Sequence, residues 1–177
     1  MRFPTLFMTP KFRLTGIALL VGWLAVPARS QMILVANNGS DTIGQFGLNG
    51  TNLGTLATGV SFPNGLALDA AGNVYVAAAG TTSVNAYSAA GGSLGTFAST
   101  GLNNPMGLAF DTAGNLYVAN FGSNSVERFS PAGADLGVFA SANLNGPAAL
   151  VFDHSGNLYV ANYFREISGS FRRRDSR

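Results

Sequence analysis

The chain has 177 residues, of which 47% are hydrophobic and 10% charged, and 23 are glycines. This length predicts one domain, and the composition is typical of a β-rich protein with many short turns. The chain has no cysteine, which excludes a disulfide framework, thiolate metal sites and thiol catalysis.

The net charge of +2 is the sum of three regions of different sign. Residues 1–30 hold four basic and no acidic residues, residues 32–162 hold six acids against Arg128 alone, and residues 163–177 hold five arginines against two acids. A nucleic-acid-binding domain places Lys and Arg on its folded face to neutralise phosphates. Because the central region has a single Arg, we expect no nucleic-acid partner.

Residues 1–30 are predicted to be a secretory signal peptide. Met1–Arg13 carries the positive charge, and Leu14–Val26 is an uncharged apolar run that is shorter than the roughly 20 residues of a membrane span. Small residues follow, with cleavage expected after Ser30 or after Ala28. The protein is therefore expected to be secreted, periplasmic or at the cell surface, without a stable membrane span after cleavage. An uncleaved membrane anchor is the alternative.

Residues 31–162 contain a repeat of 42 residues. Pro63, Pro105 and Pro147 are spaced by this interval. The same interval separates the acids and the glycines of a recurring D-x-x-G-N segment, namely Asp69, Asp111 and Asp153, and Gly72, Gly114 and Gly156. A repeat in fixed register indicates one supersecondary unit that is stacked on copies of itself.

The expected strands follow the repeat in chain order. Residues 33–59 match the second to fourth strands of a unit. The next unit has strands at 65–68, 73–77, 83–87 and 93–97, and the following one at 107–110, 115–119, 125–129 and 135–139. A last unit begins with strands at 149–152 and 157–162. The first two strands of each unit are nearly continuous apolar runs, which predicts that both of their faces are covered.

The D-x-x-G-N segment is interpreted as the turn between the first two strands. The Asp carboxylate is expected to accept hydrogen bonds from turn amides, and the Gly to take a positive φ. A ring of metal-binding acids is the alternative, but each loop has only one acid, whereas calcium loops supply several oxygens. We expect no metal and no cofactor.

The pattern P-x-G-L-A-x-D-x-x-G-N-L-Y-V-A-N, followed by S-N-S-V-x-x-F and G-x-F, resembles NHL repeats from about Ile33 to Asn162. The resemblance implies an all-β fold, a β-propeller of four-stranded antiparallel blades with the first strand innermost. NHL propellers typically have six blades, which at this period need roughly 250 residues. About 3.5 blades are present here, so we expect an open or partial ring.

In such propellers, ligands usually bind the loops after the second and fourth strands. Asn37, Asn120 and Asn162 end second strands, and Phe121 and Tyr163 follow two of them. These five residues are candidates for a shallow polar and aromatic binding face. The alternative is that the asparagines fix their loops and the aromatic rings pack between blades.

No catalytic residues are predicted. His154 is the only histidine and lies in an expected turn beside Asp153, so it lacks the partners of a general base or a zinc ligand. The favoured function is a secreted binding or scaffold module for an unknown protein or polysaccharide, as a fragment of a longer protein. The alternative is a metal-dependent, lactonase-like hydrolase or a lyase.

Residues 163–177 form a basic tail in which the repeat fails. A truncated or frame-shifted piece of a longer gene, two chains that join in one ring, and a tail that caps a partial ring are the three explanations. An open end would expose strand edges and apolar surface, which favours self-association.

Overall fold

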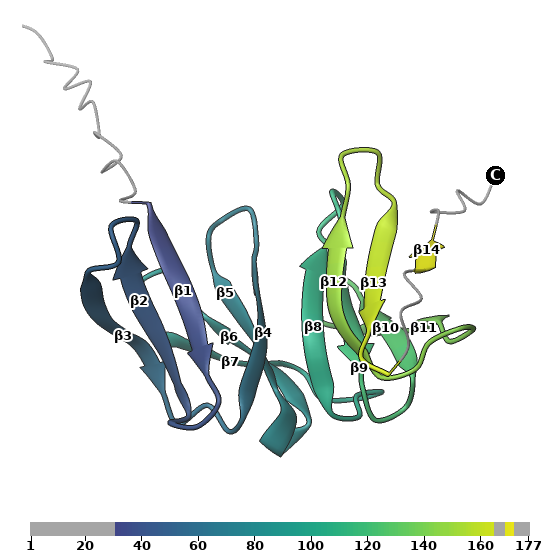
Figure 1. The fold of residues 1–177 in the computed structure, drawn as a ribbon, viewed down its shortest axis with the longest axis horizontal. Coiled ribbons are helices and arrows are strands. Elements are labelled where there is room, and N and C mark those ends of the chain that lie inside the picture. The colour runs from purple at the N-terminus through teal and green to yellow at the C-terminus, as the bar shows by residue number, and fades with distance from the viewer. Residues whose placement is uncertain (1–30, 165–168, 172–177) are drawn as a thin grey trace, which may run out of the picture. The chain divides into compact units, whose positions relative to one another are not determined.

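The structure is a computed structural model that describes residues 31–164 and 169–171. It contains four antiparallel sheets, which we number as blades in chain order (Figure 1). Blade 1 comprises β1 (Met32–Asn37), β2 (Thr42–Gly47) and β3 (Asn52–Thr58). Blade 2 comprises β4 (Pro63–Leu68), β5 (Val74–Ala78), β6 (Ser83–Tyr87) and β7 (Ser93–Ala98). Blade 3 comprises β8 (Pro105–Phe110), β9 (Leu116–Asn120), β10 (Ser125–Phe129) and β11 (Asp135–Ala140), and blade 4 comprises β12 (Pro147–Phe152), β13 (Leu158–Asn162) and β14 (Gly169–Phe171).

The predicted all-β fold of four-stranded antiparallel sheets is confirmed. Blades 2 and 3 are meanders, in which each strand pairs with the next one along the chain. Both third strands begin and end at the predicted residues, and each fourth strand is one residue longer than predicted. Among the described residues, blade 1 has three strands and shows no first strand, as the repeat phase predicts.

Three local features differ from the sequence prediction. In the tail where the repeat was predicted to fail, β14 pairs with β13. The first strands begin at their prolines, two residues early, because Pro63 and Pro105 lie opposite the ends of the second strands. A short 3₁₀ turn, η1 (Ala79–Thr81), follows β5 in blade 2. The predicted signal peptide lies outside the described residues. Within residues 31–164 and 169–171, no helix has the length and apolarity that a membrane crossing requires.

The blades pack face to face along the chain, and their first strands are neighbours. β8 contacts β4 on one side and β12 on the other, and β4 also contacts β1 (Figure 1). The approach is closest at Gly65 and Gly107. A Cβ added at Gly107 would lie 2.8 Å from the Cα of Ala149, and one added at Gly65 would overlap the carbonyl oxygen of Met106. Glycine at this repeat position therefore lets two first strands pack backbone to backbone.

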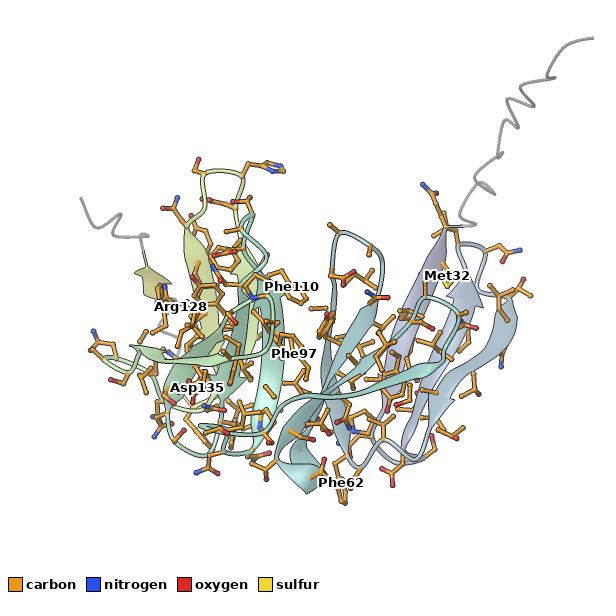
Figure 2. All side chains as sticks on the ribbon, turned by 180° about the vertical axis from the view of Figure 1, so that it is seen from behind. Met32, Phe62, Phe97, Phe110, Arg128 and Asp135 are labelled. Carbon is orange, nitrogen blue, oxygen red and sulfur yellow. The ribbon has the colours of Figure 1, made fainter. Side chains whose placement is uncertain are left out.

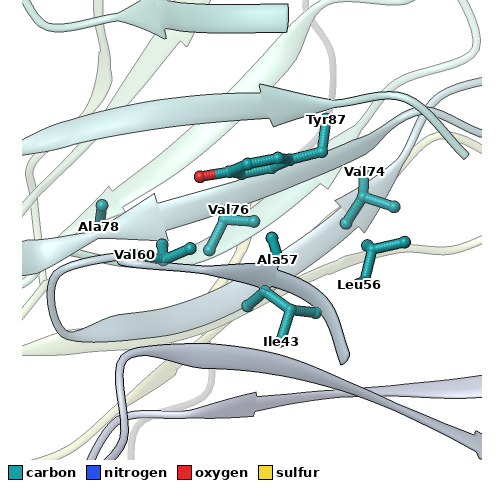
Figure 3. Packing of buried hydrophobic residues seen from close by; sticks show 8 residues of the cluster. All are labelled: Ile43, Leu56, Ala57, Val60, Val74, Val76, Ala78 and Tyr87. Atoms are coloured by element: carbon teal, nitrogen blue, oxygen red, sulfur yellow. The ribbon is translucent and has the colours of Figure 1, made fainter. Parts of the chain in front are cut away.

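A hydrophobic cluster fills the space between each pair of neighbouring blades. Between blades 1 and 2, Ile43, Val60, Val74 and Val76 are at most 2% exposed (Figure 3). Side chains of a second strand alternate between two clusters, since Val74 and Val76 pack toward blade 1 and Ala77 packs toward blade 3. This two-sided burial explains the continuous apolar runs in the sequence.

An aromatic ring on the second strand of blade 2 and of blade 3 joins each of these blades to the next one. The Tyr75 ring meets the rings of Phe97 and Phe110 edge on, each at 4.9 Å between centroids. Tyr117 repeats the arrangement with Phe139 at 4.9 Å and Phe152 at 5.0 Å. Edge-to-face pairs add roughly 0.5–1.5 kcal/mol each beyond simple burial, so these tyrosines help to fix how adjacent blades pack.

Candidate functional site

The acids of the D-x-x-G-N segments are committed to turns. Asp69 Oδ1 accepts a hydrogen bond from the Asn73 amide at 2.8 Å, and Oδ2 accepts one from Asn73 Nδ2 at 2.8 Å. The hydroxyl of Tyr75 donates to the same Oδ2 at 3.4 Å. Gly72 closes the turn with a φ of 81°. Partial burial raises the pKa of Asp69, but these hydrogen bonds outweigh it and hold the pKa below its ordinary value of 3.8.

The same network recurs in the next two blades. Asp111 accepts from Asn115, and Asp153 accepts from Asn157, both through the backbone amide and the side chain. Gly114 and Gly156 have φ values of 83° and 80°. His154 is exposed within the last turn. Across the part of the chain that the structure describes, no three His, Asp or Glu side chains lie close enough together to hold a metal ion.

A groove lies between the turns of blades 2 and 3. It has a volume of about 570 Å³, and its walls include Leu68, Tyr75 and Phe110, with Asp69 and Asp111 among the polar groups. Both carboxylates already accept turn hydrogen bonds. The groove therefore offers a mainly apolar surface, with acids whose oxygens are already engaged in turns.

At the opposite end of the strands, the three candidate asparagines hold loops in place. Asn120 is fully buried; its Oδ1 accepts from the Asn103 amide at 3.1 Å, and its Nδ2 donates to the Gly101 carbonyl at 2.9 Å. Asn162 accepts from the Asn145 amide at 3.1 Å and donates to the Asn143 carbonyl at 3.2 Å. Asn37 donates to Thr42 Oγ1 at 3.3 Å. A ligand at this end would therefore meet what these loops display rather than the Asn120 amide.

What two of the loops display is a group of three aromatic rings, which we call the aromatic patch: Phe121, Tyr163 and Phe164. The ring centroids of Phe121 and Tyr163 lie 5.9 Å apart, those of Phe121 and Phe164 5.5 Å, and those of Tyr163 and Phe164 5.0 Å. Tyr163 is 72% exposed and Phe164 59% exposed. Large aromatic surfaces left in water on a loop face are typical of binding sites.

Hydrogen bonds of the backbone amides hold the loops of the aromatic patch together. The amide of Tyr163 donates to the Gly146 carbonyl at 2.8 Å, and the Gly146 amide donates to Asn124 Oδ1 at 2.7 Å. A Cβ at Gly146 would lie 2.7 Å from a ring carbon of Phe164 and 3.0 Å from one of Phe121. Gly146 has a φ of 64°, so both its conformation and its lack of a side chain allow the rings to gather there.

Sequence reasoning missed Phe164 as a member of the aromatic patch. Its repeat equivalent in blade 3 is Gly122, so the signal was the replacement of a turn glycine by a large aromatic residue. Phe62 is another exposed aromatic residue, at 55%, in the loop before β4 (Figure 2). Its amide donates to Asp41 Oδ1 at 3.0 Å, so blade 1 holds this loop.

A carboxyl pair was also missed. Glu127 on β10 is only 4% exposed and lies beside Asp135. Asp135 begins β11 (Figure 2). Burial, followed by the charge of Asp135 and a hydrogen bond with it, raises the pKa of Glu127 from 4.5 to about 7. The carboxyl of Glu127 faces Gly101, where an added Cβ would lie 3.2 Å from its Cδ. The equivalent residues of blade 2 are the uncharged Asn85 and Ser93.

No protein-family model and no curated protein matches the chain. Solved structures do. A nidogen/laminin complex matches with a TM-score of 0.69 and 24% identity over 76% of this chain and 53% of that one. A streptogramin B lyase matches with a TM-score of 0.64 and 12% identity over 76% of this chain and 46% of that one. The fold is part of a β-propeller.

A third match is a protein of unknown function from Bacteroides caccae, with a TM-score of 0.63 and 19% identity over 82% of this chain and 54% of that one. The chain spans about half the length of the solved structures that it matches. One of them is a lyase and another is a complex with laminin, so the fold is shared by proteins of different function.

Proposed function

We propose that this chain is an exported binding module of the NHL-like propeller type, which holds a protein or polysaccharide through the aromatic patch. The exposure of Tyr163 and Phe164 next to Phe121 is the observation that carries the proposal. Two aromatic rings that lie mostly in water oppose solubility and folding, and contact with a ligand removes that cost.

The arrangement of the patch also favours binding. The loops of blades 3 and 4 present the rings on backbone that is already hydrogen bonded, so a ligand would order little of the protein when it binds. Phe121, Tyr163 and Phe164 carry no charge, and the adjoining side chains Asn103, Asn124 and Asn145 are amides. In the part of the chain that the structure describes, this aromatic and amide surface suits a protein loop or a neutral sugar chain.

Binding by paired variants tests the proposal. The full chain is screened against immobilised cell-surface polysaccharides and against extracellular proteins, and the dissociation constant of each hit is measured. Tyr163→Ala and Phe164→Ala are each expected to weaken binding about tenfold or more, as central aromatic contacts do. Leu94→Ala, which removes an exposed side chain from β7, is the control. If the parent protein and the three variants bind every hit with equal affinity, the aromatic patch is not the binding site.

A metal-dependent hydrolase or lyase is the second candidate, and the raised pKa of Glu127 favours it, because a buried carboxyl with a pKa of about 7 suits a general acid or base. Elemental analysis of the purified protein, together with assays on lactone and lyase substrates, separates the two candidates. Stoichiometric calcium or zinc, with turnover that Glu127→Gln abolishes, would replace the binding proposal by the enzymatic one.

A further inference from the structure

The outward side of blade 4 is an apolar sheet face that no described residue covers. We call the residues Ala149, Val151, Tyr159 and Ala161 the blade 4 outer face. Val151 is 59% exposed and Tyr159 is 41% exposed. Both side chains line a shallow hollow of about 210 Å³. In blade 3 the equivalent Tyr117 is 2% exposed because the rings of Phe139 and Phe152 pack on it. Among the described residues no ring packs on Tyr159.

Blade 1 has the complementary open side. We call Ile33, Val35 and Phe46 the blade 1 outer face. Ile33 is 48% exposed, and its strand partner Phe46 is half-buried. The equivalent pair of blade 2 is Val74 and Tyr87, which are 2% and 9% exposed because they pack on blade 1.

The two open faces are therefore the two halves of an interface that this chain already forms between its own blades. The residues of the blade 4 outer face are the repeat equivalents of the blade 3 residues that face blade 4. The residues of the blade 1 outer face are the repeat equivalents of the blade 2 residues that pack on blade 1. We infer that the blade 4 outer face of one chain packs on the blade 1 outer face of a second copy, head to tail, and that two copies close one ring.

One substitution within the repeat favours a second copy over a further regular blade. Gly65 and Gly107 lie against the first strand of the next blade, where a Cβ would overlap its backbone. The third residue in this series is Ala149, which carries that Cβ. A regular blade with a first strand would collide with it. Within residues 31–164, blade 1 shows no first strand, so a copy that presents blade 1 leaves room there for the methyl group.

Two residues further along β12, on the same face, the repeat residue is again replaced by a larger one. Ala67 and Ala109 precede it in the repeat, and Val151 takes their place on the blade 4 outer face. A larger side chain fills space at an interface where one strand is absent. Twice the four sheets falls within the range of roughly four to eight blades that propellers use.

Because the interface joins two different patches, it is heterologous, and such contacts make either a closed ring or an open filament. Disulfide formation between introduced cysteines tests which two faces meet and whether the ring closes. The natural chain contains no cysteine, so every disulfide comes from the introduced residues. Val151→Cys and Ile33→Cys are made as separate variants of the full chain, with Leu94→Cys as an exposed control on β7. Each is oxidised alone and in mixtures under mild conditions.

The mixture of Val151→Cys with Ile33→Cys is expected to give a disulfide-linked species of two chains, at least tenfold more than either variant alone or than mixtures with Leu94→Cys. Light scattering of the unmodified protein should give twice the mass of its denatured chain. Equal cross-linking of Val151→Cys with itself would overturn the head-to-tail arrangement. A monomer at concentrations of about 100 µM would overturn the association, and species larger than two copies would overturn the closed ring.

Discussion

At the scale of the residue, most polar side chains of the blades serve the backbone. Asp69, Asp111 and Asp153 satisfy turn amides, and Asn120 satisfies a loop amide and a loop carbonyl. Buried polar groups are stable only when they are paired in this way. The acids that looked most regular in the sequence are thus engaged in structure, and the groups left for a ligand are aromatic.

Loss of one turn carboxylate should destabilise the fold without affecting binding. Asp69→Ala leaves the amides of Asn73 without their acceptor, and we expect a loss of about 1–3 kcal/mol of unfolding free energy, measured by urea denaturation. Because the folded state lowers the pKa of Asp69, its contribution is present above the unfolded pKa and is lost as the pH falls through the folded pKa. Ala70→Ser, at an exposed turn position, is the control and should change stability by less than about 0.5 kcal/mol. A loss at pH 7 no larger than that of the control would contradict the role.

Glu127 should show the opposite pH dependence. Its folded pKa of about 7 lies above the ordinary 4.5, so its contribution is complete below pH 4.5 and is lost as the pH rises through 7. Glu127→Gln removes this titration. We expect the variant to gain about 1–2 kcal/mol over the parent protein at pH 8 and to differ little at pH 4.5, measured by denaturation at both values. The same difference at both values would show that Glu127 does not titrate in this range.

At the scale of the element, the repeat made the strands predictable. The phase of Pro63, Pro105 and Pro147 located the strands of blades 2 and 3, together with β12 and β13, to within about two residues, because turn chemistry recurs at fixed offsets. It did not predict β14, which lies where the repeat fails. The turn acids were predictable for the same reason, since Asp69 and Asn73 are four residues apart. The Glu127 and Asp135 pair depends on how β10 and β11 pair and on the approach of Gly101 from the preceding loop, which no local pattern specifies.

The close packing of the first strands β8 and β12 at Gly107 can be tested by one substitution. Gly107→Ala places a Cβ 2.8 Å from Ala149 Cα and 2.9 Å from the Ala148 carbonyl oxygen, so backbone must move to accept it. We expect a loss of about 1–3 kcal/mol of unfolding free energy, as overpacking usually costs. Gly39→Ala is the matched control, because nothing lies within 4 Å of its added Cβ. A Gly107→Ala protein as stable as the control would show that blades 3 and 4 do not approach each other this closely.

At the scale of the whole molecule, a sheet face is buried where a neighbouring blade packs on it and exposed where none does. Blades 2 and 3 have neighbours on both sides and bury their second strands, whereas Tyr159 and Ile33, on the two outer faces, remain in contact with water. The sequence predicted open ends from the number of units. It did not predict the exchange of glycine for Ala149, whose meaning depends on the distance between β8 and β12.

Association through these faces should make stability depend on concentration. If two copies share both open faces, folding and association are coupled, and the melting temperature rises with protein concentration by mass action. We expect a rise of several degrees over about a hundredfold range, measured by calorimetry or circular dichroism. Val151→Glu buries a charge in that interface and should give a lower melting temperature that no longer depends on concentration. Leu94→Glu, at an equally exposed position on β7, should keep the dependence of the parent protein. A melting temperature of the parent protein that is constant across the range would mean that each chain folds alone with both outer faces in water.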